Sequence, residues 1–238
     1  MPEVEQASAW LEQAGATDIW GQDWELGIDQ SRWMVCRYEE VWIETGWAPI
    51  LSFDAFVHRI AAGAFTDYGR LRMGWTVLQA VPLRTEGRLA SWQATLAVYP
   101  DGLAERVIAE QTLIWADPHV PRVRWALAER SERMGLALRL VWDMQNLLRV
   151  LFAVNHMWDQ DLKWTDKRSL VMPIKLADLS ARIDAMFTLT ELYQAVEINQ
   201  RLIVETLELA ASQGFDVHGA LQSMRAALFA GLERSRLL

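Results

Sequence analysis

The sequence predicts an α+β fold, with a small N-terminal sheet region over residues 1–50 and a helical bundle over residues 51–238. Two observations support this class. Short aromatic and β-branched runs alternate with turn residues near the N-terminus, which is typical of strands. From residue 89 onward, apolar residues recur at helical spacing almost throughout.

The N-terminal region reads as a short helix followed by a hairpin. Residues 3–14 form an amphipathic pattern that Gly15 is placed to end. The runs 24–28 and 33–38 are separated by a short polar stretch, so we expect them to pair as two strands. Residues 39–47 form either a third strand or a short helix.

The C-terminal region reads as a series of helices divided by breakers. Ser52 is a candidate cap for a helix over residues 55–62, and residues 71–80 stay ambiguous. Further breaks fall near Asp101, which caps the next predicted helix, and at Pro121, which suits a first turn. The last third predicts two helices, over residues 182–213 and after Gly214.

One long helix carries two different faces. Its apolar stripe steps by three and four residues, as one buried face does, through Leu140, Met144, Leu147, Leu151, Val154 and Trp158. A neighbouring face carries Asp143, Asn146 and Arg149. Asn155 closes the apolar run, so the helix delivers it, and then the Lys163–Trp164 pair, to one end of the bundle.

Composition narrows the class of partner. The formal net charge of −8 argues against broad contact with a nucleic-acid backbone, although a local basic pocket stays possible. The single cysteine, Cys36, allows no internal disulfide, which fits a reducing cytoplasm. No apolar run is long enough to span a bilayer, so we expect no membrane partner.

Two interpretations stay open for the candidate binding residues. Lys163 and Trp164 either contact an anionic ligand and stack on its base, or cap and close the bundle. Asn155 either binds ligand or is satisfied by the backbone, and Asn199, set within an apolar stripe, has the same two alternatives. No metal-ligand spacing is found among the histidines.

Several short pieces occur in an order that resembles the bacterial nucleotidyltransferase-like proteins, relatives of the aminoglycoside and lincosamide nucleotidyltransferases. These pieces span roughly residues 50–175, at residues 63–67, 81–83, 99–101, 151–155 and 163–164. The resemblance implies a truncated nucleotidyltransferase-like sheet before the bundle. It also implies transfer of a nucleoside monophosphate from a nucleoside triphosphate to a small-molecule hydroxyl, or a degenerate descendant of that activity.

The catalytic motif of that family is incomplete here. Such enzymes use a Gly-Ser turn and an Asp-x-Asp pair, with a third acid, to hold two Mg²⁺ ions on the triphosphate. This sequence contains no Gly-Ser dipeptide, and Asp23 and Glu25 are the nearest substitutes for the paired acids. Mg²⁺ and a nucleoside triphosphate are therefore expected only if the chain is active.

The alternative is a non-catalytic ligand-binding or protein-interaction module. A sheet of two or three strands leaves an unpaired edge, so we expect either a homodimer or another partner to cover residues 24–38. In either case the expected ligand is a small molecule or a nucleotide.

Overall fold

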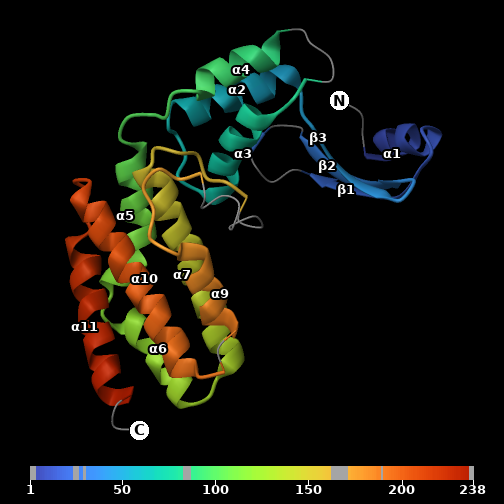
Figure 1. Cartoon of the computed structure of the whole chain (residues 1–238). Helices are drawn as coiled ribbons and strands as arrows, with labels where there is room; N and C mark the ends of the chain where they lie inside the picture. Colours follow the sequence, from blue (N-terminus) through green and yellow to red (C-terminus); the bar gives the residue numbers. More distant parts are fainter. Residues whose placement is uncertain are drawn as a thin grey trace. The chain divides into compact units, whose positions relative to one another are not determined.

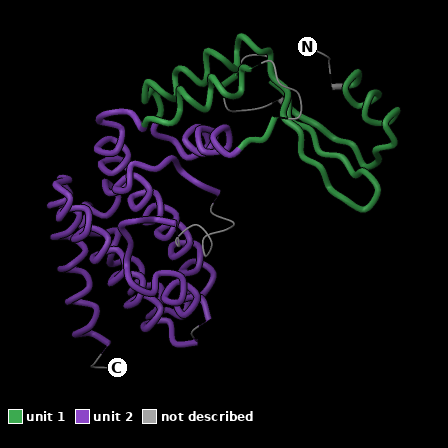
Figure 2. The backbone as a smooth tube through the Cα atoms, turned by 45° about the horizontal axis from the view of Figure 1, so that its top comes forward, with its two compact units in different colours: residues 1–65, 80–98 green, residues 66–79, 99–238 purple. Residues whose placement is uncertain are grey.

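The structure is a computed structural model that describes residues 4–23, 27–28, 31–82, 87–161, 171–188 and 190–235. The chain divides into two compact units, Met1–Phe65 with Ala80–Val98, and Thr66–Gln79 with Tyr99–Leu238 (Figure 2). These units do not coincide with the expected boundary at residue 50. The α+β class itself is confirmed, with a three-stranded sheet near the N-terminus and helices after it (Figure 1).

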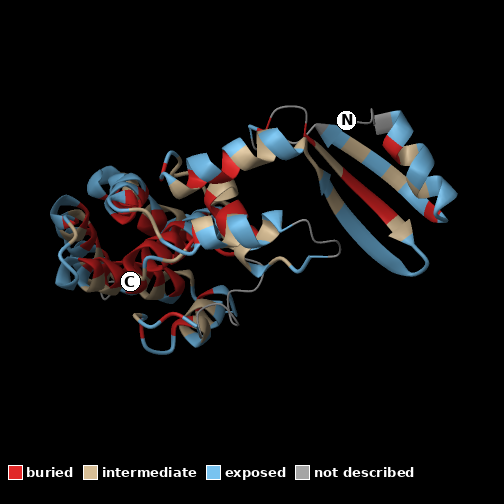
Figure 3. Cartoon of the chain, turned by 90° about the horizontal axis from the view of Figure 1, so that it is seen from above, coloured by how far each residue is buried: buried red, intermediate tan, exposed pale blue. Residues whose placement is uncertain are grey.

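The first unit contains an antiparallel sheet of order β1-β2-β3. Its elements are α1 (Val4–Gln13), β1 (Ala16–Asp23), β2 (Arg32–Tyr38) and β3 (Val41–Trp47). The middle strand carries three buried residues in a row, Met34, Val35 and Cys36. Figure 3 shows one buried stretch along the sheet. Trp10 of α1 stacks on Trp47 of β3 at a ring-centroid distance of 6.0 Å, so α1 lies over one face of the sheet.

The predicted first strand was wrong. The strand that pairs with β2 on this side is β1 at Ala16–Asp23, and of the expected strand 24–28 the structure describes only residues 27 and 28, which are not in a strand. The sequence of β1 includes Asp18, Gly21 and Gln22, which weaken a strand pattern. Pairing with β2 forms the strand nonetheless, with an irregularity between Thr17 and Trp20. The open choice for residues 39–47 resolves as strand β3.

Two helices of the first unit pack against each other. They are α2 (Ile50–Ala61) and α4 (Arg88–Leu96). The indole N–H of Trp92 donates to Asp54 at 2.9 Å, and the Trp92 ring lies 4.8 Å from that of Phe53. Helix α2 begins before the expected cap at Ser52, with Pro49 at its N-cap position.

The second unit is a bundle whose core lies along α7 and α10 (Figure 1). Its helices are α3 (Tyr68–Gln79), α5 (Leu103–Ala116), α6 (His119–Glu129), α7 (Arg133–Val154), α9 (Leu179–Thr188), α10 (Leu192–Ser212) and α11 (His218–Ser235). The apolar stripe predicted for the long helix is buried at every position, including Trp158 beyond the helix end. Within the ranges given above, no helix is long and apolar enough to span a bilayer.

Two helix boundaries differ from the prediction. The stretch 182–213 is not one helix, because α9 and α10 are separated around Thr190. Thr188 is the last residue of α9, and its hydroxyl donates to the carbonyls of Asp184 and Ala185 in the last turn. Helix α7 ends at Val154, where His156 takes a positive φ of 50° and closes the helix.

A buried ion pair joins three helices of the bundle. Arg124 of α6 and Asp143 of α7 have no exposed surface, and both Nε and Nη2 of Arg124 donate to the Asp143 carboxylate. Trp115 of α5 donates its indole N–H to the same carboxylate at 3.0 Å. The remaining Arg124 nitrogen, Nη1, donates to the carbonyl of Val120, so the pair is fully hydrogen-bonded.

Removing one partner of this pair should strongly destabilise the bundle. Asp143→Asn leaves the Arg124 charge buried without a counter-charge, and we expect the free energy of unfolding to fall by about 3–5 kcal/mol. The matched control is Glu197→Gln, which breaks the more exposed Glu197–Arg201 pair and should cost about 1 kcal/mol or less. Urea unfolding followed by circular dichroism measures both; equal losses would contradict the role given to Asp143.

Candidate ligand-binding pocket

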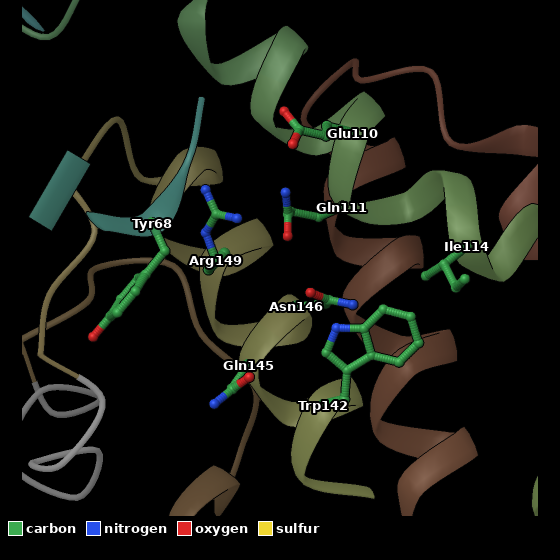
Figure 4. A pocket seen from close by; sticks show the side chains of 8 residues that line it. All are labelled: Tyr68, Glu110, Gln111, Ile114, Trp142, Gln145, Asn146 and Arg149. Carbon is green, nitrogen blue, oxygen red and sulfur yellow. The ribbon is translucent and has the colours of Figure 1, made fainter. Parts of the chain in front are cut away.

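A cavity of about 370 Å³ lies within the second unit, between α5 and α7. Figure 4 shows the side chains that line it. They are Tyr68, Glu110, Gln111, Ile114, Trp142, Gln145, Asn146 and Arg149.

Helical spacing brings the lining residues of α7 to one side. Trp142, Gln145, Asn146 and Arg149 are three, four and seven residues apart and form what we call the pocket face of α7. The polar face predicted from the sequence is therefore divided between two environments. Asn146 and Arg149 line the cavity, whereas Asp143 points into the bundle and pairs with Arg124.

Two side chains with little exposed surface, Gln111 and Asn146, bring amide groups to this cavity. Gln111 is 7% exposed and Asn146 is 8% exposed, and both side chains project into the space between α5 and α7 (Figure 4). Within the described ranges, neither amide makes a side-chain hydrogen bond. Each carries two N–H donors and a carbonyl acceptor. These amide atoms keep contact with solvent, because the fully buried side-chain atoms without a partner in the described ranges belong to Gln160, Asn199 and Ser223. The cavity thus offers a ready set of donors and acceptors.

Arg149 is held in place by bonds on two of its nitrogens. Its Nε donates to Asp159 at 2.6 Å, and its Nη2 donates to the backbone carbonyl of Thr66. In the part of the chain that the structure describes, its third nitrogen, Nη1, makes no hydrogen bond. A fixed guanidinium with a spare donor therefore lies at the cavity.

Asp159 is a buried carboxylate with an altered acidity. It is 2% exposed, and burial raises its pKa from 3.8 to about 6, although the Arg149 charge and hydrogen bond oppose the rise. The negative charge of Asp67 adds to the increase. Burial, helped by the Asp159 charge, also raises the pKa of Tyr99, whose ring stacks on His156 at 5.6 Å.

Asn155, predicted as a ligand-binding residue, is occupied by the backbone. Its amide nitrogen donates to the carbonyls of Leu151 and Ile174, both at 2.7 Å, and its oxygen accepts the Ile174 N–H at 2.8 Å. These bonds tie the end of α7 to the segment around Ile174, and Asn155 is not among the residues that line the cavity.

The other predicted site residues stay predictions. Lys163 and Trp164 lie outside the described residues, as does Glu25, and Asp23 ends β1 with a side chain that is not described. In the described ranges, no His, Cys, Asp and Glu side chains gather in a group of three or more able to hold a metal ion. Both amide atoms of Asn199 are buried without a partner among those residues, so backbone contacts there do not satisfy it.

Sequence reasoning missed the α5 side of the cavity. Gln111 stands between Glu110 and Thr112 in a predicted helix, where one more polar residue gives little signal. Its significance comes from α7, whose Asn146 lies across the cavity but is distant along the chain.

No family model, no curated protein and no solved structure matches this chain.

The titration of Asp159 should appear in the pH dependence of stability. Its pKa in the folded chain is raised, so its stabilising contribution is fully present below about pH 4 and is lost as pH rises towards 6. The rise in pKa from 3.8 to about 6 corresponds to about 3 kcal/mol. Urea unfolding across this window should therefore show wild type losing stability relative to Asp159→Asn as pH increases.

The matched control is Asp161→Asn. Asp161 lies two residues away and contacts Arg72 at 4.0 Å rather than Arg149. This variant should keep the wild-type dependence on pH. A constant difference between wild type and Asp159→Asn across the window would contradict a raised pKa for Asp159.

Proposed function

We propose that the chain is a binding protein for a small, uncharged polar molecule that occupies the cavity between α5 and α7. One observation carries the proposal. Gln111 and Asn146 are residues with less than a tenth of their surface exposed, they line the same cavity, and their amides make no hydrogen bond with described residues and so turn to the solvent in it. A ligand with hydroxyl or amide groups would supply the missing partners.

The charges around the cavity favour a neutral ligand at neutral pH. The positive charge of Arg149 is matched by Asp159 at 2.6 Å, and Glu110 adds an exposed negative charge at the rim. An anion would therefore meet no net positive charge. Trp142 and Ile114 provide apolar wall, which suits the flat face of a ring. Hydroxyl-bearing rings, such as monosaccharides and nucleosides, fit this combination.

Nucleotidyl transfer stays a prediction that rests on the family resemblance. Under that prediction the acceptor hydroxyl attacks the α-phosphate and releases pyrophosphate, so acceptor, Mg²⁺ and nucleoside triphosphate must be bound side by side. Asp23 and Glu25 remain the candidate acids for this activity. The cavity supports binding of a hydroxyl-bearing molecule in either case, so the two functions are separated by an assay for product.

The binding proposal is tested by a screen of uncharged and charged small molecules. Thermal shift identifies ligands among monosaccharides, nucleosides, polyols and their phosphorylated forms, and calorimetry measures their affinities at neutral pH. Uncharged members should bind more tightly than their phosphorylated counterparts. Asn146→Leu and Gln111→Met keep side-chain size but remove the polar atoms, and each should weaken binding by roughly tenfold or more.

The control for these variants is Gln194→Met on α10, which makes the same chemical change outside the cavity. It should leave affinity unchanged. Because the cavity amides make no hydrogen bond with described residues and contact solvent, Asn146→Leu and Gln111→Met remove no bond from the fold and should melt near the wild-type temperature. Unchanged ligand affinity in both cavity variants would reject the site.

An assay with labelled nucleoside triphosphate, Mg²⁺ and each bound ligand separates binding from transfer. The binding proposal predicts no labelled product. Product that forms with wild type and is lost in Asp23→Asn would instead establish nucleotidyl transfer.

A further inference from the structure

We propose that the cavity changes the class of ligand it accepts by taking up one proton on Asp159. With Asp159 ionised the cavity holds uncharged ligands, and with Asp159 protonated it binds a small oxyanion on Arg149. This inference rests on the proposed function, because it assigns a regulation and a second ligand class to the same site.

The geometry places one guanidinium between the carboxylate and the cavity. Arg149 contacts Asp159 through Nε, is fixed to the Thr66 carbonyl through Nη2, and lines the cavity. The two bonds hold the guanidinium so that a change of charge on Asp159 does not require Arg149 to move. The charge that an incoming ligand meets therefore depends on the protonation of Asp159.

The charged groups that face Asp159 come from several segments. Arg149 of α7 attracts its negative charge, while Asp67, before α3, repels it and is itself paired with Arg70 at 2.9 Å. The phenol of Tyr99 lies close enough to be influenced by the Asp159 charge. Among these described groups, Arg149 is the cation that contacts Asp159, so protonation removes the charge that pairs directly with Arg149. The exposed Glu110 carboxylate stays at the rim of the cavity, so the change is from a net negative to a balanced charge around Arg149.

The Asp159 carboxyl changes its protonation state in mildly acidic solution. Burial raises the pKa of Asp159 to about 6, and an anion bound to Arg149 would raise it further by repelling the ionised form. Binding of an anion near neutral pH should therefore take up a proton, and anion affinity should increase as pH falls.

The probe is methanesulfonate, a small monovalent oxyanion that stays ionised throughout the range tested. Calorimetry at about pH 5 and about pH 8 should show binding to wild type that is at least roughly tenfold tighter at the lower pH. Asp159→Asn removes the titrating charge, so it should bind methanesulfonate at both pH values with the affinity of wild type at about pH 5. Asp161→Asn should keep the wild-type pH dependence.

A second measurement needs no variant. Calorimetry of wild type in buffers with different ionisation enthalpies reports the protons exchanged on binding, and the proposal predicts uptake of about one proton near neutral pH. Equal methanesulfonate affinity at both pH values, or binding without proton uptake, would overturn the proposal, even if Asp159→Asn fails to fold.

Failure of this inference and failure of the proposed function give different results in these experiments. Uncharged ligands that bind wild type at about pH 8, without methanesulfonate binding at about pH 5, would overturn the proton-linked inference alone. Absence of binding by every uncharged member of the screen would reject the proposed function, on which this inference depends.

Discussion

The buried ion pair between Arg124 and Asp143 fixes how α7 is rotated against its neighbours. Both side chains are fully enclosed, and Trp115 of α5 completes the hydrogen bonds of the carboxylate. Burying two charges is costly unless their hydrogen bonds are complete, so few rotations of α7 satisfy this requirement. Once Asp143 points to Arg124, the pocket face of α7 is directed towards the cavity beside α5.

A second ion pair, between Arg149 and Asp159, lies near the end of α7 and differs from the first in that it borders the cavity. Arg149 is shared among the cavity, the Thr66 carbonyl and Asp159, whereas Arg124 is used entirely inside the bundle. The first pair therefore organises structure, and the second leaves a donor and a titratable group beside the cavity. The two ion pairs of α7 thus differ in their surroundings, because Arg124–Asp143 is enclosed in the bundle whereas Arg149 lines the cavity.

Much of the helical framework was predictable, because a long apolar stripe gives a strong periodic signal. The stripe from Leu140 to Trp158 and the polar face beside it follow from spacing alone. β1 was missed because its own residues are poor strand formers and its pairing with β2 decides its conformation. The role of Gln111 could not be predicted, because its environment is created by tertiary packing against α7. Asn155 was noticed for its position, but its amide is used to hold Ile174.

Ligand binding in the cavity requires the amides of Gln111 and Asn146 to contact the ligand. The most direct measurement is nitrogen-15 NMR of side-chain NH₂ groups, assigned with Gln111→Met and Asn146→Leu, during titration with the tightest uncharged ligand. The account predicts that these two NH₂ signals shift strongly on binding, while that of Asn155, already bonded to Leu151 and Ile174, changes little. Saturable binding that leaves the Gln111 and Asn146 signals unmoved would contradict it.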